Sequence, residues 1–214
     1  MTGTSVAAAI LAGGRARRYG GVVKSTLVLD GARIIDRQIA ELRKVADPIF
    51  IVAQDPAPFA SLGLVVVPDV VPDCGALGGI YTAIVRSPRP RTLVVAGDLP
   101  FLSPALLARL VQETDADLVV PRGPQGNEPL CAVYSSACAG PIRRRLESGA
   151  LRAAIPPEGV RVEEIGPEML AAYDPDGLLF VNVNTPHDYE RARDLIESLP
   201  QRPGDGITDK HSPS

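Results

Sequence analysis

The chain has 214 residues, of which 45% are hydrophobic and 22% are charged, and its formal net charge is -3. This length suits a single domain with a sizeable core. The acidic balance and the 4% of aromatic residues argue against a nucleic-acid binder. The three cysteines are widely spaced, and every apolar run falls far short of the roughly 20 residues that span a bilayer. We therefore expect a cytoplasmic protein without a disulfide framework, a zinc site or a membrane anchor.

Short apolar runs alternate with amphipathic stretches along most of the chain. The sequence predicts strands at 6–11, 48–53, 64–67, 92–96, 117–121, 130–134, 161–165 and 179–183. It predicts helices at 33–45, 78–86, 103–113, 137–147 and 185–199. This alternation indicates an α/β fold around a mostly parallel sheet. We expect residues 1–199 to form one domain, and residues 200–214, rich in Pro, Gly, Asp and Ser, to be a disordered tail.

The first predicted strand leads directly into a loop, residues 11–24, that holds four glycines and four cationic residues. Glycines let the backbone approach a ligand, and successive N–H groups of such a loop form an anion-binding nest. The P-loop pattern does not fit, because Arg18 and Val23 stand where it requires glycines. Since parallel sheets bind ligands at the carboxyl ends of their strands, the loop predicts a polyphosphate site.

Two carboxylates follow other predicted strands. Asp98 comes directly after the strand at 92–96 and suits Mg²⁺, which takes one or two carboxylates together with phosphate oxygens and water. Asp69 follows the strand at 64–67 and suits the N–H groups of guanine or a ribose hydroxyl. A simple turn residue is the alternative interpretation for each of them.

Two later segments also carry candidate binding residues. Gly79 belongs to a glycine-rich stretch that opens a helix. Two interpretations are open for these glycines: an anion binds at the helix N-terminus, or the helix packs closely against the sheet. Asn182 and Asn184 flank one valine at the end of the predicted strand at 179–183, so we expect their amides to face the same side. Amides donate and accept hydrogen bonds, as a pterin ring does.

Three segments carry a family resemblance. Residues 11–24 match L-A-G-G-x-x-x-R-x-G-x-x-x-K, a signature loop of nucleotidyltransferases, and residues 97–102 resemble the metal motif of the same enzymes. Residues 180–186, F-V-N-V-N-T-P, closely resemble the C-terminal motif of molybdenum cofactor guanylyltransferases. The resemblance spans roughly residues 6–193. It implies a three-layer αβα, Rossmann-like nucleotidyltransferase fold with a mostly parallel sheet and one antiparallel strand.

The resemblance also implies a reaction: GMP is transferred from Mg-GTP to molybdopterin, which yields the molybdopterin guanine dinucleotide cofactor and pyrophosphate. GTP and molybdopterin would be the substrates and Mg²⁺ the cofactor, in a monomer or weak homo-oligomer that contacts cofactor-insertion proteins or apo-molybdoenzymes transiently. The nucleotide would be bound at Leu11, Ala12, Gly13, Gly14, Lys24, Asp69 and Asp98. Arg18, Lys24 and Asp98 would be catalytic, Asp98 also holding the metal, and molybdopterin would be bound at Gly79, Asn182 and Asn184.

Two alternatives from the sequence stay open. The first is a related nucleotidyltransferase with another base or acceptor, such as a molybdopterin cytidylyltransferase or a sugar-1-phosphate nucleotidyltransferase. The second is a non-catalytic nucleotide-binding or cofactor-delivery module. The departure that keeps the second alternative open is Val23, which stands where the family usually has an acidic residue before the loop lysine.

Overall fold

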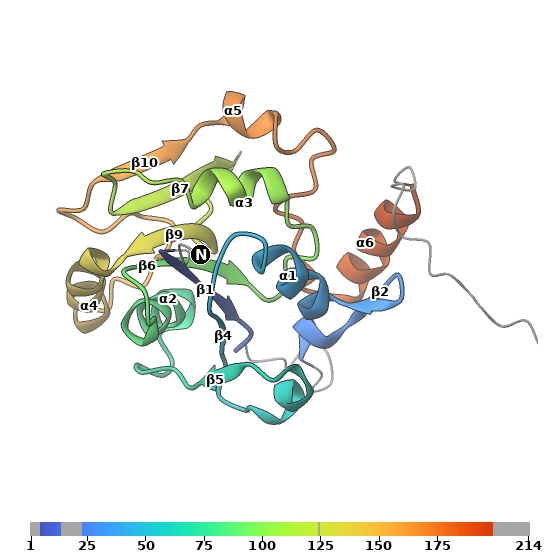
Figure 1. Ribbon diagram of the computed structural model, residues 1–214, viewed down its shortest axis with the longest axis horizontal. Coiled ribbons are helices and arrows are strands. Elements are labelled where there is room, and N and C mark those ends of the chain that lie inside the picture. Colours follow the sequence, from blue (N-terminus) through green and yellow to red (C-terminus); the bar gives the residue numbers. More distant parts are fainter. Residues whose placement is uncertain (1–4, 14–22, 124, 199–214) are drawn as a thin grey trace, which may run out of the picture.

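A computed structural model describes residues 5–13, 23–123 and 125–198 of the chain. Within these residues an eight-stranded sheet has the order β10-β7-β9-β6-β1-β4-β5, with β8 paired to β7 (Figure 1). The strands of this sheet are β1 (Val6–Leu11), β4 (Ile49–Val52), β5 (Val65–Val67), β6 (Arg91–Ala96), β7 (Leu118–Gly123), β8 (Gly126–Asn127), β9 (Cys131–Ser135) and β10 (Val162–Ile165). A separate hairpin joins β2 (Val28–Leu29) and β3 (Ala32–Arg33).

The helices connect and cover these strands. The α-helices are α1 (Ile34–Leu42), α2 (Gly75–Arg86), α3 (Pro104–Leu110), α4 (Ala139–Glu147), α5 (Pro167–Ala171) and α6 (Pro186–Ser198). The short 3-10 helices are η2 (Lys24–Thr26), η3 (Ala57–Leu62) and η4 (Ser136–Cys138). Among the described residues, no helix combines the length and the apolar character that crossing a bilayer requires.

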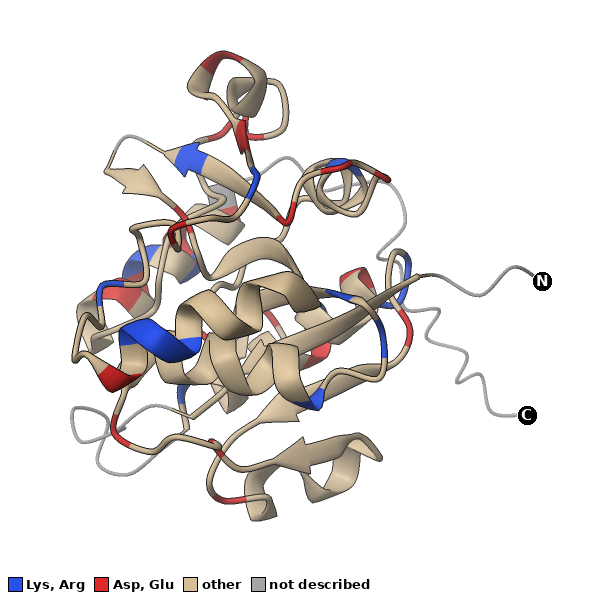
Figure 2. Cartoon of the chain, turned by 90° about the vertical axis from the view of Figure 1, so that its left-hand side faces the viewer, with Lys and Arg blue, Asp and Glu red and all other residues tan. Residues whose placement is uncertain are grey.

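Successive side chains of β1 point to opposite faces of the sheet, so the core is divided into two layers, one on each face. Ala8 and Ile10 belong to a cluster with apolar side chains of α1 and α3, whereas Ala7 and Ala9 belong to a second cluster with those of α2 and α4. β1 and β4 contain no charged residue and β6 has only Arg91, at its start, as expected for strands buried on both faces, and Figure 2 accordingly shows the middle of the sheet in tan. The protein therefore has the predicted three-layer αβα fold.

Strand directions place the functional edge of the sheet. β1 is parallel to β4 and β6, and β4 is parallel to β5, so the strand ends at Leu11, Val52, Val67 and Ala96 lie at one edge. β9 is antiparallel to both β6 and β7. The mostly parallel sheet with an antiparallel strand is thereby confirmed.

The C-terminal helix is attached to the molecule through the small hairpin. Asp30 and Gly31 have φ angles of 47° and 75°, the left-handed pair that a tight two-residue hairpin requires. A third apolar cluster joins Leu29 of this hairpin to Val183 and to Ala192 of α6. α6 consequently lies beside β2 (Figure 1), although about 160 residues separate them in the chain.

The strand predicted at 179–183 is wrong, because these residues form turns and irregular backbone. The Asp174 carboxylate accepts hydrogen bonds from the N–H groups of Leu178 and Leu179 at 2.7 and 3.2 Å, which turns the chain here. Leu179 and Val183 are 4% and 0% exposed. The apolar run therefore reflects a loop buried against the core, not a pleated strand.

Candidate functional site

The carboxyl ends of β1, β4, β5 and β6 border a pocket of about 310 Å³, at the lower end of the size range of small-molecule sites. The described residues that line it are Leu11, Ala12, Gly13, Val23, Lys24, Ser25, Val52, Asp69, Gly75, Ala76, Gly79, Ala96, Gly97, Asp98 and Leu130. A second cavity, between α2 and β7, measures about 10 Å³ and has room for little more than a water molecule. The larger pocket is thus the candidate site.

Lys24 and Asp98 meet in this pocket although they are far apart in the sequence, one in η2 and the other in the turn directly after β6. Lys24 Nζ lies 3.9 Å from Asp98 Oδ2 and donates a hydrogen bond of 2.7 Å to Asn184 Oδ1. The two charged side chains are each about one quarter exposed. Burial raises the pKa of Asp98 above its ordinary value, and the nearby charge of Lys24 offsets this only in part. The ion pair thus lies in a partly desolvated environment, where charge interactions are stronger than in water.

The turn that carries Asp98 is anchored from three directions. Gly97 N–H donates to Leu11 O at 2.9 Å, and Val183 N–H donates to Asp98 O at 3.0 Å. From α1, Gln38 Nε2 donates to the carbonyls of Ala96 and Leu99 at 2.7 and 2.9 Å. Gln38 is 1% exposed, and sequence reasoning missed it, although an amide on the apolar face of a predicted helix was a signal. These contacts fix the position of the Asp98 carboxylate.

Asp69 reaches the pocket from the end of β5. The next residue, Val70, donates its N–H to Thr82 Oγ1 at 2.9 Å, and this hydroxyl donates in turn to Gly78 O in α2. Burial raises the pKa of Asp69, while the hydroxyl of Thr82 acts in the opposite direction. Its buried Oδ1 atom lacks a hydrogen-bond partner among the described residues. Asp69 is therefore a carboxylate with an unused acceptor at the pocket wall.

The beginning of the first loop is held against β4. The N–H groups of Ala12 and Gly13 both donate to Val52 O, at 3.0 and 3.1 Å. Leu11 O accepts from the turn after β6. The two N–H groups are therefore committed to the sheet and do not form the anion nest expected of this loop. Gly14 and Arg18 lie outside the residues that the structure describes.

Gly79 lies in the first turns of α2, against the end of β1. A Cβ atom at this position would come within 2.9 Å of Leu11 Cδ1, so a larger residue would displace the end of the Leu11 side chain, and glycine allows helix and sheet to pack closely here. Close packing was one of the two reasons that the sequence offered. Gly79 also lines the pocket, together with Gly75 and Ala76 at the start of the helix.

The two asparagines of the C-terminal motif differ in their contacts. Asn184 Oδ1 accepts from Lys24, whereas Asn182 Nδ2 donates to Phe180 O in its own loop at 3.2 Å. Both side chains are exposed and the valine between them is buried. The structure therefore brings Asn184 to the Lys24–Asp98 pair, and it does so without the predicted strand.

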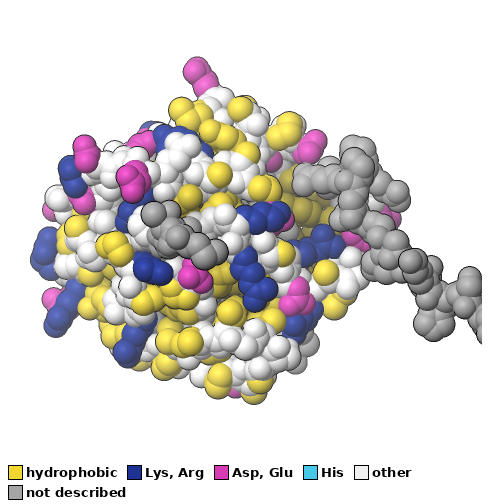
Figure 3. Space-filling view, viewed as in Figure 1, with side chains coloured by type: hydrophobic (Ala, Val, Ile, Leu, Met, Phe, Trp, Pro, Cys, Tyr) yellow, Lys and Arg dark blue, Asp and Glu magenta, His cyan; other side chains and the backbone are white. Residues whose placement is uncertain are grey.

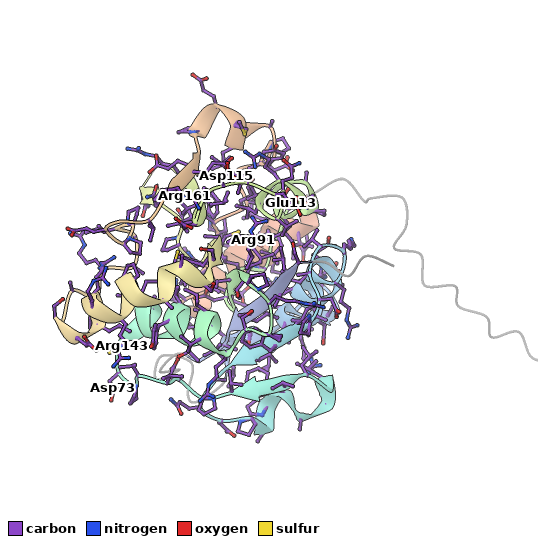
Figure 4. All side chains as sticks on the ribbon, turned by 60° about the vertical axis from the view of Figure 1, so that its left-hand side comes forward. Asp73, Arg91, Glu113, Asp115, Arg143 and Arg161 are labelled. Atoms are coloured by element: carbon purple, nitrogen blue, oxygen red, sulfur yellow. The ribbon has the colours of Figure 1, made fainter. Side chains whose placement is uncertain are left out.

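A second group of charged residues lies away from the pocket, at the amino ends of the strands. Figure 4 shows Arg91, Glu113, Asp115 and Arg161 in this region. Arg91 starts β6 and donates to the carbonyls of Leu110 and Val111 at the C-terminus of α3. Such contacts satisfy the last carbonyl groups of a helix, so the role of Arg91 is structural.

A Rossmann-like αβα fold with a lysine and a carboxylate facing each other at the carboxyl ends of its parallel strands suits a nucleotidyltransferase, and the family match shows that the chain is one. Residues 8–162 match the model of the MobA-like NTP transferase domain. A molybdenum cofactor guanylyltransferase of Desulfosudis oleivorans is 35% identical over 196 residues, which cover 91% of this chain and 97% of the relative. The chain belongs to the molybdenum cofactor guanylyltransferase family.

Solved structures share this fold. The crystal structure of molybdopterin-guanine dinucleotide biosynthesis protein A from Archaeoglobus fulgidus has a TM-score of 0.74 and 26% identity, and the match covers 90% of this chain and 99% of that one. A nucleotidyl transferase from Methanothermobacter thermautotroptrophicus, 21% identical, shares the fold with a TM-score of 0.66 over 91% of this chain and 99% of that one.

Proposed function

We propose that this protein transfers GMP from GTP to molybdopterin, which produces molybdopterin guanine dinucleotide and pyrophosphate. The observation that carries the proposal is the meeting of Lys24, Asp98 and Asp69 around one pocket, in a chain of the guanylyltransferase family. An oxygen of the terminal phosphate of molybdopterin would form a bond to the α-phosphorus of GTP. The bond between that phosphorus and the oxygen leading to the β-phosphate would break, and pyrophosphate would leave.

Lys24 and Asp69 would hold the two ends of the nucleotide. The ammonium of Lys24 neutralises charge on the phosphates, including that which builds up on the leaving pyrophosphate. The unpartnered Oδ1 of Asp69 accepts a hydrogen bond from the N–H groups of guanine or from a ribose hydroxyl. Leu11, Ala12 and Gly13 would contact the nucleotide through atoms other than the N–H groups that Val52 occupies. We keep Gly14 and Arg18 as further phosphate-binding residues.

The donor set of the pocket fits a magnesium ion. Asp98 offers a partly exposed carboxylate beside the pocket, and Mg²⁺ needs only one or two carboxylates when phosphate oxygens and water complete its shell. Asp98 would hold the ion, which when bound withdraws negative charge from the phosphates. The chain itself contributes positioning, because the Asp98 turn is fixed by its contacts to α1, β1 and the C-terminal segment.

Molybdopterin would lie toward the C-terminal segment. Gly79, at the pocket wall, and the exposed amides of Asn182 and Asn184 are the residues that we propose to contact it. Asn184 already accepts a hydrogen bond from Lys24, so it links the acceptor side of the site to the nucleotide side. A cytoplasmic location, a monomer or weak homo-oligomer, and transient contact with cofactor-insertion proteins or apo-molybdoenzymes stay predictions.

A comparison of the four nucleoside triphosphates tests the reaction. Purified protein is incubated with Mg²⁺, molybdopterin and one of the nucleotides, and pyrophosphate release and dinucleotide formation are measured. We expect pyrophosphate release and dinucleotide formation with GTP and with none of the other three nucleotides. A preference for CTP would indicate a cytidylyltransferase, turnover with a sugar 1-phosphate in place of molybdopterin would indicate a sugar nucleotidyltransferase, and GTP binding without turnover would indicate a delivery module.

The same assay tests Lys24 and Asp98. Removal of one group that stabilises developing charge costs about 3 kcal/mol, or roughly 10²-fold in rate. We therefore expect Lys24→Ala and Asp98→Ala each to lower kcat about 10²-fold, while circular dichroism shows an intact fold. The matched control is Lys44→Ala, because Lys44 is an exposed lysine outside the pocket that pairs with Glu41 of α1. Near-normal turnover in either site variant would contradict the role given to that residue.

A further inference from the structure

The hydroxyl of Ser25 has no part in the site as described so far. Ser25 is the middle residue of η2, it is 2% exposed, and it lines the pocket. Among the residues that the structure describes, its Oγ atom finds no hydrogen-bond partner. Buried polar atoms are hydrogen-bonded in the great majority of cases, so a buried free hydroxyl at a pocket wall calls for a physical reason.

The local fold of η2 does not supply that reason. The adjacent hydroxyl, Thr26 Oγ1, donates to Val23 O at 2.7 Å. The backbone closes the same turn through Thr26 N–H to Val23 O at 2.9 Å and Leu27 N–H to Lys24 O at 3.0 Å. The turn is thus complete without Ser25 Oγ. Of the two neighbouring hydroxyls, Thr26 has a structural partner, whereas Ser25 has none within the described part of the chain.

The surroundings of Ser25 indicate what kind of atom it would bind. Lys24 precedes it, and the turn after β6 passes close by, since a Cβ atom on Gly97 would lie 3.2 Å from Ser25 Cβ. Asp98 follows Gly97 in that turn. A hydroxyl can donate one hydrogen bond, and the adjacent ammonium favours an acceptor that carries negative charge. An anionic oxygen in the pocket satisfies both groups together.

We propose that Ser25 Oγ donates a hydrogen bond to a phosphate oxygen of the bound nucleotide, beside the charge of Lys24. This inference deepens the proposed function and rests on it. The hydroxyl has no partner among the described residues and gains one when the phosphates enter. Ser25 is therefore a binding residue whose contribution appears on ligand binding and is absent from the stability of the free fold.

Two neighbouring variants separate binding from folding. For wild type, Ser25→Ala and Thr26→Val, we would measure the melting temperature of the free protein and the Kd of GTP and of pyrophosphate, both with Mg²⁺, by calorimetry. We expect Ser25→Ala to keep or raise the melting temperature and to weaken both ligands about tenfold to hundredfold, the range for a hydrogen bond to a charged group. Thr26→Val should lower the melting temperature and leave both affinities unchanged.

Each other outcome has a defined meaning. Equal affinities in wild type and Ser25→Ala would overturn the role of Ser25 alone, and so would a lower melting temperature of the free Ser25→Ala protein. If Ser25→Ala weakened ligand binding with Mg²⁺ present but not without it, the hydroxyl would belong to the coordination shell of the metal, and the phosphate contact would be overturned. A wild type that binds pyrophosphate but not GTP would contradict the proposed function. The pyrophosphate affinities of wild type and Ser25→Ala would then still test the role of Ser25. A wild type that binds neither would overturn both.

Discussion

At the scale of single residues, the pocket keeps polar atoms in positions that cost stability in the free protein. Asp98 is a partly buried carboxylate with a raised pKa, and Asp69 Oδ1 is buried without a described partner. Unsatisfied or desolvated groups of this kind are costly, and proteins retain them mainly where a ligand repays the cost. The same residues that suit a nucleotide therefore also destabilise the free fold.

Replacement of Asp98 by asparagine should make this cost visible. The pKa of Asp98 is raised by burial more than Lys24 lowers it, so the folded state disfavours its charged form. This destabilisation is absent below the ordinary aspartate pKa of about 3.9, where the carboxyl is neutral in both states. It reaches its full size once the pH exceeds the raised pKa of the folded state. We expect Asp98→Asn to increase the free energy of unfolding at pH 7 and to leave it unchanged well below about pH 4. Urea titrations with a chelator present measure this difference.

The control for this experiment is a carboxylate outside the pocket. Asp36→Asn removes an acidic side chain of α1 that pairs with Arg33, the last residue of β3. It should not raise stability at pH 7. A lower urea midpoint for Asp98→Asn than for wild type at pH 7 would show that the ion pair with Lys24 outweighs desolvation.

At the scale of elements, the site depends on how three segments hold the turn after β6. Parallel pairing with β1 sets the end of β6, Val183 from the C-terminal segment binds the turn, and Gln38 connects it to α1. Positioning of a charged group to within a fraction of an ångström is a large part of what such sites contribute to rate. Gln38 is accordingly a positioning residue for Asp98.

The variant Gln38→Leu tests this positioning. Leucine keeps much of the volume but removes the side-chain donor of Leu99 O and leaves Ala96 O with the N–H of Leu99 at 3.3 Å, which should cost about 1–3 kcal/mol of stability. We expect kcat to fall about tenfold and the Mg²⁺ concentration for half-maximal rate to rise. The matched control is Ile142→Ala in α4, a comparable loss on the opposite face of the sheet. If both variants changed the metal dependence equally, the effect would belong to stability and not to positioning.

At the scale of the whole molecule, a second small core closes the chain on itself. Residues of α6 pack against the β2–β3 hairpin, and the Tyr189 hydroxyl donates to Val28 O. This docking carries Asn184 to Lys24. On the face shown in Figure 3, basic and acidic side chains are interspersed with apolar ones, so the charge gathered in the pocket is a local feature. The C-terminal helix is therefore part of the site as well as of the fold.

Two truncations test this organisation. We propose that the domain ends near residue 199, so removal of residues 200–214 should leave the melting temperature and the guanylyl transfer rate unchanged. Removal of residues 186–214 takes away α6 and the packing of Ala192 on the hairpin. We expect this second variant to lose several degrees in melting temperature and most of its activity, as measured by circular dichroism and pyrophosphate release. A melting temperature that falls equally in both variants would contradict the boundary.

Much of the fold and part of the site could be predicted from local patterns. The strand at 6–11 has the predicted ends, and the other strands of the sheet lie within about two residues of theirs, because buried apolar runs and the glycines that end them are local features. The β2–β3 hairpin, η3, β8 and α5 were missed, since each is too short to show periodicity. The apolar run at 179–183 predicts a strand but forms a buried loop, because a buried loop and a buried strand have similar composition.

The sequence by itself determined the αβα class, the edge of the sheet where ligands bind and the family, because each depends on residues that are neighbours in the chain. Only the tertiary structure decided that Asn184 binds Lys24, that Gln38 holds the Asp98 turn and that Ser25 is buried with a free hydroxyl. The first two contacts join residues 160 and about 60 positions apart. They depend on how helices pack on the sheet, and no pattern within one segment records that packing.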